Sequence, residues 1–332
     1  MFSPSAQDRS GDKPIKQVVP ILCLVGVVGL LSSVTPIFKY IFQHSSMSVL
    51  SLACGRVLIG SLFLASITAC IDSRGLRALR PCQVLQLTAL GILGVGAYAV
   101  AAWGLMYTSV THYALLYSLL PTITALLSMY RGKDRATPAT CCGILLSWAG
   151  CTLAVSEGTG FQEIGFGFGD ALVLLFTLMM SGYIVLSPNV VKQFGVWTSN
   201  TTMFGTNALL LMVGIAAGGM TPQEDDLSVE VAGLLLFIGM ATAGVFLLRS
   251  RALQSLTPAT VGAYHNLIPI CTIGLAHFIL GEAVTTYTLL GGTAVVGGTE
   301  LIRRASFLPH HTAESVPTWR LRYPISSFLP AK

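Results

Sequence analysis

Long apolar runs separated by short polar links dominate the chain. A helix needs roughly 20 mostly apolar residues to cross the hydrocarbon core of a bilayer, and ten runs approach or reach that length. The short links favour antiparallel helical hairpins over separate domains. The ten predicted spans are Val18–Phe42, Met47–Ile71, Val84–Met106, Tyr113–Tyr130, Ala139–Val155, Ala171–Val191, Thr198–Ala217, Val231–Leu248, Ala259–Leu280 and Val284–Ile302.

Composition places these runs in a membrane rather than in a soluble core. Of 332 residues, 53% are hydrophobic and 10% are charged, against roughly 25% charged residues in a soluble domain. The eight cysteines lie in or near the apolar runs, where we expect free thiols that pack as small hydrophobes. The net charge of +5 is too diffuse to indicate nucleic acid. We therefore predict an all-α integral membrane protein.

Basic residues alternate from one link to the next, and this alternation predicts the orientation. Lys and Arg occur in the amino-terminal tail, in the second, fourth, sixth and eighth links, and in the carboxyl-terminal tail, but not in the odd-numbered links. Arg249 and Arg251 are assigned to the eighth link; only Lys39 and Arg56 fall outside the scheme. Because basic links stay in the cytoplasm, the pattern predicts ten spans with both termini cytoplasmic.

The two halves of the sequence align without a gap when one is shifted by 148 residues. Pro121 then aligns with Pro269, Gly143 with Gly291 and Gly150 with Gly298. Because each half holds five predicted spans, an odd number, the halves must be inverted relative to each other. The predicted organisation is a cytoplasmic tail (1–17), a first five-helix repeat (18–156), a second five-helix repeat (167–303) and a disordered cytoplasmic tail (304–332).

The stretch Leu253–Ile302 resembles the second EamA repeat of the drug/metabolite transporter superfamily. The shared marks are a small and polar helix start, the mid-helix Pro269, the pair Gly281-Glu282 and a glycine-rich last helix. The stretch Gly104–Val155 resembles the first repeat, although residues 131–134 replace its usual Gly-Glu. Arg56 and Lys39 lie where the family's second and first helices often carry an arginine and a lysine.

This resemblance implies a carrier with one central cavity that works by alternating access. Members of the superfamily move amino acids, other metabolites, drugs, nucleotide sugars or sugar phosphates. The sugar-phosphate branch has a Lys-Arg pair in the ninth helix where this chain has Ile268-Pro269. We therefore expect efflux of a small organic metabolite across a plasma membrane, which would be the inner membrane in a bacterium. The alternative is a nucleotide-sugar or sugar-phosphate antiporter of an internal membrane.

No arrangement of residues indicates an enzyme. The predicted spans hold no paired acids and no His/Cys motif at metal-ligand spacing, which intramembrane hydrolysis or metal catalysis would need. The expected partners are a small-molecule substrate and membrane lipid, with no cofactor and no nucleic acid. A coupling proton, a counter-substrate and a homodimer are left open.

Polar side chains inside the spans are the candidates for a substrate site, because they are costly in hydrocarbon. His265 and Asn266 align with Tyr117 and Ser118 in the repeat, and each pair lies one turn before a proline whose missing N–H frees a backbone carbonyl. Hydrogen bonding between helices is the alternative role. The predicted substrate-binding residues are His265, Asn266, Tyr117, Ser118, Tyr264, Lys39 and Trp103, and the predicted structural or gating residues are Pro121, Pro269 and Arg56.

Each residue outside the paired group has an ordinary alternative. Lys39 lies near the external end of the first span, where it could face substrate or extend to the membrane surface. Arg56 lies deeper, and we expect it to bind carbonyls at a helix end. Trp103 could stack on substrate or anchor the helix at the interface. Because few acids within the spans balance these cations, the sequence also predicts a substrate with an anionic group, such as a carboxylate, that Lys39 approaches from the external half.

Overall fold

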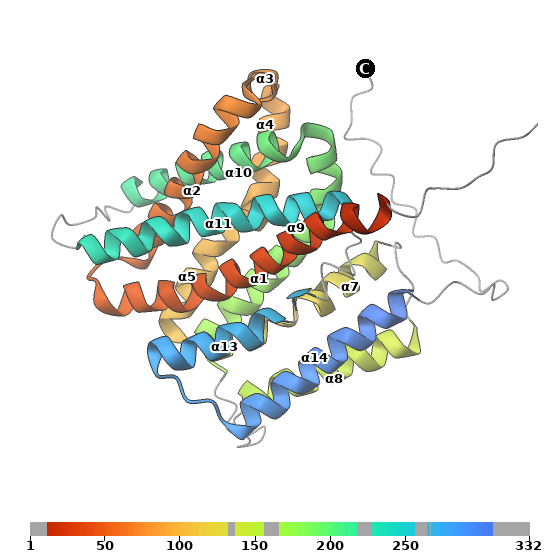
Figure 1. Cartoon of the computed structure of the whole chain (residues 1–332). Helices are drawn as coiled ribbons and strands as arrows, with labels where there is room; N and C mark the ends of the chain where they lie inside the picture. Colours follow the sequence, from red (N-terminus) through yellow and green to blue (C-terminus); the bar gives the residue numbers. More distant parts are fainter. Residues whose placement is uncertain are drawn as a thin grey trace, which may run out of the picture.

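Helices form all the regular structure in the part of the chain that the computed structural model describes, which is residues 12–131, 137–155, 166–217, 228–255, 264–265 and 267–307 (Figure 1). The first half contains α1 (Asp12–His44), α2 (Val49–Ile71), α3 (Ser73–Arg77), α4 (Pro81–Gly91), the π-helix η1 (Ile92–Gly96), α5 (Ala97–Tyr107), α6 (Val110–Tyr117), α7 (Leu120–Tyr130) and α8 (Pro138–Val155). The second half contains α9 (Phe168–Phe194), α10 (Val196–Ala217), α11 (Val229–Ser255), α13 (Leu267–Leu280) and α14 (Thr286–Phe307).

Several of these helices can cross a membrane. Among the described residues, seven helical segments are long and apolar enough, and two shorter apolar helices, Pro138–Ala154 and Leu267–Leu280, accompany them. The all-helical fold is therefore confirmed. The count of ten spans stays a prediction.

Two predicted spans differ in detail from the observed helices. The run Tyr113–Tyr130 is interrupted between α6 and α7, because Pro121 has no N–H to continue the helical ladder and lies instead in the first turn of α7. In the second half, Pro269 occupies the same place near the start of α13. The third run contains the π-helix η1 between α4 and α5.

The eighth predicted span ends too early. We expected it to end at Leu248, with Arg249 in a cytoplasmic link, but α11 continues to Ser255 and Arg249 is only 1% exposed. The assignment of Arg249 to a link is therefore wrong. Aromatic side chains from neighbouring helices enclose its guanidinium, and the hydropathy of one segment does not report on such neighbours.

The helices pack in pairs drawn from both halves of the chain. In Figure 1, α1 lies along α11 and α8 lies along α14. Further contacts join α5 to α9 and α2 to both α10 and α11. The core of the bundle thus lies between the two halves rather than within either one.

Close approach of backbones joins α8 to α14. A Cβ atom at Gly143 would lie 2.6 Å from the carbonyl oxygen of Gly298, and one at Gly150 would lie 2.6 Å from that of Gly291. Ser147, between the two α8 glycines, donates its hydroxyl to the Gly143 carbonyl and lies 3.5 Å from that of Val295. Only glycine permits this spacing, as in other tightly packed membrane helices.

Candidate functional site

Six rings from four helices meet in the centre of the bundle. This aromatic cluster contains Tyr98 of α5, Tyr113 and Tyr117 of α6, Phe176 and Tyr183 of α9, and Phe246 of α11, all buried. Phe176 is stacked on Tyr117 and Tyr113, with centroids 5.3 and 5.7 Å apart, and lies 5.3 Å from Tyr98. Phe246 lies 5.3 Å from Tyr183 and 6.1 Å from Tyr98. The rings therefore form one continuous apolar surface with four hydroxyl groups.

Two buried arginines border the aromatic cluster. The Arg56 guanidinium lies 4.2 Å from the centroid of Tyr98, and its Nε donates to the Thr242 hydroxyl over 2.7 Å. Arg249 reaches the other side of the cluster, where it interacts with Tyr117, Tyr98 and Tyr183. Its Nη2 lies 3.3 Å from His265 Nε2, and its Nη1 lies 3.6 Å from the Met180 sulfur. Within the described residues, no acid forms an ion pair with either arginine.

Four buried polar atoms of this region have no hydrogen-bond partner in the described structure. They are Arg56 Nη2, Tyr98 Oη, Tyr117 Oη and Arg249 Nε. Buried polar groups are nearly always satisfied, and unsatisfied ones commonly mark the place of water or a ligand. Two of these atoms belong to the arginines and two to the aromatic cluster. This region is therefore the candidate substrate site.

Of the predicted residues on and opposite the ninth span, His265 and Tyr117 lie in this site. His265 is buried beside Arg249, and Tyr117 belongs to the aromatic cluster. Ser118 is buried next to Tyr117 but donates its hydroxyl back to the Leu115 carbonyl. Tyr264 is half-buried against a small apolar group that includes Leu24 and Ala252. Asn266 lies outside the described residues.

The other predicted residues lie apart from the cluster or have different partners. Lys39 Nζ donates to the carbonyls of Leu105 and, over 2.9 Å, Thr108, where α5 ends. Trp103 is 55% exposed on the outer surface. Arg56, which we expected to bind helix-end carbonyls, has Thr242 and Tyr98 as its described partners. The helix-end role thus falls to Lys39.

Hydrogen bonds close the end of the bundle around Lys39, which the charge pattern predicts to face outward. The Thr108 hydroxyl donates to Asp170 over 2.6 Å, and His112 Nδ1 lies 3.6 Å from the same carboxylate. Glu282 accepts the backbone N–H groups of Val110 and Thr111, each over 2.8 Å, at the start of α6. The turn between α5 and α6 is therefore tied to α1, to α9 and to the residues that precede α14.

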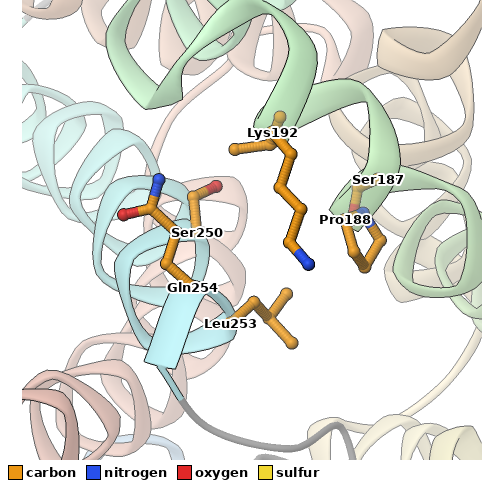
Figure 2. Close-up of a pocket in the computed structure, with 7 residues that line it drawn as sticks. Ser187, Pro188, Lys192, Ser250, Leu253 and Gln254 are labelled. Atoms are coloured by element: carbon orange, nitrogen blue, oxygen red, sulfur yellow. The ribbon is translucent and has the colours of Figure 1, made fainter.

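A small pocket lies at the opposite end, between α9 and α11. Ser187, Pro188, Val191 and Lys192 line it from α9, and Ser250, Leu253 and Gln254 line it from α11. Figure 2 shows the Lys192 side chain extending across this space, with its amine toward Leu253. Tyr183 lies beside Ser187 and Ser250, so it joins the pocket to Arg249.

The sequence did not identify Arg249, Tyr98, Tyr183 or Phe176 as site residues. The three aromatic residues look like ordinary apolar positions in the sequence, and Arg249 follows an apolar run like any loop cation. The repeat alignment offered one usable signal, because it placed Tyr117 opposite His265.

The sequence of this chain is similar to known transporter sequences. The sequence model of the EamA-like transporter family matches residues 19–156 and, a second time, residues 167–304. An uncharacterized transporter of Archaeoglobus fulgidus is 26% identical over 230 residues, covering 69% of this chain and 79% of that protein. The uncharacterized transporter YetK of Bacillus subtilis is 24% identical over 310 residues, covering 90% of each chain.

A protein of solved crystal structure has the same fold, with a TM-score of 0.64 at 16% identity over 86% of this chain and 97% of that chain. The family match covers most of the sequence, and the helices described above are apolar enough to cross a membrane. The chain therefore belongs to the EamA-like transporter family of the drug/metabolite transporter superfamily, and it is a multi-pass membrane transporter rather than an enzyme.

Proposed function

We propose that this protein is a secondary transporter that moves small organic metabolites by alternating access. In this proposal the two halves, residues 18–156 and 167–303, are inverted five-helix repeats with both termini in the cytoplasm. The substrate binds between them, and the protein exports it across the plasma membrane.

Contacts that repeat when the two halves are exchanged support the inverted arrangement. Gly143 meets Gly298, and the residues aligned with them, Gly291 and Gly150, also meet. Gly91 packs against Asn207, and the residues aligned with these two, Gly239 and Ile59, are in contact as well. Tyr98 and Phe246 are aligned with each other and in contact, as are Ser147 and Val295. A two-fold axis in the membrane plane would produce such a pattern.

The unsatisfied polar atoms between the two arginines are the observation that carries the proposal. They belong to side chains from both halves, as expected of an alternating-access site, and they are buried at the aromatic cluster. The two ends of the bundle differ, because hydrogen bonds tie the Lys39 end together and a pocket opens at the Lys192 end. This arrangement suits a conformation closed toward the outside.

The character of the site favours a small metabolite over a nucleotide sugar. A nucleotide-sugar site would offer several cations and amides, whereas the described site is a ring cluster with two arginines, one histidine and no amide side chain. Six clustered rings suit a compact substrate with an apolar body.

Transport in proteoliposomes tests the proposal. We expect the purified protein to accelerate uptake of at least one compound in a screen of amino acids, other organic acids, nucleotide sugars and amphiphilic drugs. His265→Ala and Tyr117→Ala should each reduce that uptake roughly tenfold or more, because each removes a group from the enclosed site. Tyr130→Ala is the matched control, since Tyr130 is 91% exposed. Full activity of both site variants, at equal folded protein, would contradict the proposal.

A further inference from the structure

We infer that Arg249 binds the carboxylate of the transported substrate, and that this substrate is an organic monoanion with an apolar or aromatic body and no ammonium group. The inference rests on the proposed transport function and names its substrate class. It goes beyond the sequence prediction, which gave the anion-binding role to Lys39.

The surroundings of Arg249 leave its charge without an anionic partner among the described residues. A guanidinium carries five N–H donors in a planar fork. Its described hydrogen-bond partners are the Met180 sulfur and a ring nitrogen of His265, and it also interacts with the Tyr117 side chain, so all of these partners are uncharged or basic. Its Nε has none, although the side chain is only 1% exposed. An unpaired buried cation is costly, and a carboxylate is the group that matches the fork in two parallel hydrogen bonds.

The repeated scaffold does not explain Arg249. The close glycine contacts recur in both halves, so they belong to the fold that the repeats share. Arg249, by contrast, is aligned with Ala101, and Arg56 is aligned with Phe204. A charged side chain in the membrane interior is costly, and the aligned position in the other half shows that the fold does not require one. The charge therefore points to a role in binding rather than in folding.

The rings next to Arg249 indicate what the carboxylate is attached to. Tyr117 and Phe176 are stacked with centroids 5.3 Å and planes 18° apart, and Tyr113 is also stacked on Phe176, with planes 22° apart. A flat or apolar group that parts these rings would replace their mutual contact with its own ring contacts, while it lies close to the Tyr98 and Tyr117 hydroxyls. The rings thus favour a substrate whose body is itself flat or apolar.

The charges around the site argue against an ammonium group on the substrate. Both arginines repel a cation, and no described acid pairs with either of them. The buried carboxylate of Asp170 is already engaged by Thr108 and by the backbone N–H of Gly167, toward the Lys39 end. A zwitterion would therefore bury its ammonium group without a charged partner.

A basic path leads to Arg249 from the pocket at the other end. Figure 2 shows Lys192 at the mouth of that pocket, with Ser187 and Ser250 on its two walls. Tyr183 lies beside both serines and also interacts with Arg249. An anion entering there would meet the exposed Lys192, then hydroxyl donors, then the buried guanidinium.

Four compounds that share one phenyl ring test the inference on the wild-type protein. Hydrocinnamate is an anion, hydrocinnamamide is neutral, phenylalanine is a zwitterion and phenethylamine is a cation. We expect hydrocinnamate to raise the thermal unfolding midpoint of the purified protein and to bind roughly 10- to 100-fold more tightly than its amide, as expected for a charged hydrogen-bonded pair. Phenylalanine and phenethylamine should bind more weakly than hydrocinnamate.

Variants of Arg249 then test whether this side chain causes the preference for the acid over the amide. Arg249→Gln should abolish the preference for the acid over the amide, whereas Arg249→Lys should keep the preference at lower affinity. Arg251→Gln is the matched control, because Arg251 is an exposed residue two positions along α11 that lies 6.0 Å from the Trp197 ring. This control should bind like the wild type.

The outcomes separate this inference from the proposed function. If the wild type binds acid and amide alike, or binds none of the four compounds, the inference is wrong even where transport of another compound is found. An unchanged preference in Arg249→Gln would also overturn it. If Arg249→Gln does not fold, the wild-type series and Arg249→Lys still decide. Selective acid binding without any transport in proteoliposomes would contradict the proposed function and leave the inference supported.

Discussion

Lys39, Arg56 and Arg249 carry three buried or half-buried positive charges, and each charge has different surroundings. Lys39 donates to two carbonyls where α5 ends, a place that favours a cation because the free carbonyls and the helix dipole are negative there. Arg56 is satisfied in part by a hydroxyl and an aromatic face. Arg249 has a thioether, an imidazole and tyrosine side chains as its described partners, with no carbonyl or carboxylate oxygen among them. We therefore regard Lys39, whose ammonium group the protein itself hydrogen-bonds, as structural, and Arg249 as the cation that binds substrate.

At the residue scale we predict that Lys39→Gln destabilises the protein without changing its substrate preference. Glutamine is shorter and uncharged, so it can replace at most part of the bonding to the Leu105 and Thr108 carbonyls. The expected loss is about 1–3 kcal/mol of unfolding free energy, measured by thermal or denaturant unfolding in detergent. Arg77→Gln, at an exposed position, is the control. A fully stable Lys39→Gln protein that has lost its preference for anions would show that Lys39 binds substrate instead.

At the element scale, the contact between α8 and α14 depends on which glycines face the partner helix. Gly291 and Gly298 of α14 both meet backbone atoms of α8, whereas a Cβ atom at the neighbouring Gly297 would meet only the end of Leu146 at 4.0 Å. The two faces of α14 therefore tolerate a side chain to very different degrees, although the sequence around them is similar.

We predict that Gly298→Ala lowers stability and that Gly297→Ala does not. The added methyl at residue 298 would lie 2.5 Å from the Gly143 carbonyl oxygen and would also overlap the Ser147 hydroxyl, so the helices must separate. Overpacking of this kind costs about 1–3 kcal/mol, while alanine at residue 297 should be neutral or add up to ~1 kcal/mol through helix propensity. Unfolding midpoints of the two proteins, measured side by side, check the difference. Equal stability of the two variants would mean that α8 and α14 do not pack as described.

The sequence predicts the elements better than their interruptions. Apolar length predicts a helix at each run, and the repeat alignment identifies Gly143, Gly150, Gly291 and Gly298 before their contacts are known. The break before Pro121 has a local cause, the missing proline N–H, which apolar length alone does not take into account. The extension of α11 past Leu248 depends on partners from other segments, so periodicity along one run cannot show it. The same reason hides the aromatic cluster, whose members lie on four helices.

At the scale of the whole molecule, a nearly symmetric scaffold surrounds an asymmetric site. The glycine contacts and the pair Tyr98–Phe246 are exchanged or preserved when the halves are swapped. The arginines, the hydrogen bonds at the Lys39 end and the pocket at the Lys192 end are not. Under the proposed alternating access, such a combination would allow two conformations of similar energy, one open to each side, because exchanging the roles of the halves would convert one into the other.

Accessibility from both sides of the membrane tests this account most directly. The measurement uses single cysteines in a cysteine-free protein, with Ser118→Cys beside the site, Ser46→Cys at the end of the bundle near Lys39 and Ala78→Cys at the opposite end, the last two at exposed positions. A membrane-impermeant thiol reagent is applied to right-side-out and to inside-out vesicles. We predict that Ser46→Cys reacts only from outside, that Ala78→Cys reacts only from the cytoplasmic side, and that Ser118→Cys reacts slowly from both sides and is protected by substrate. Reaction of Ser118→Cys from one side only, with transport intact, would contradict alternating access through a site between the two halves.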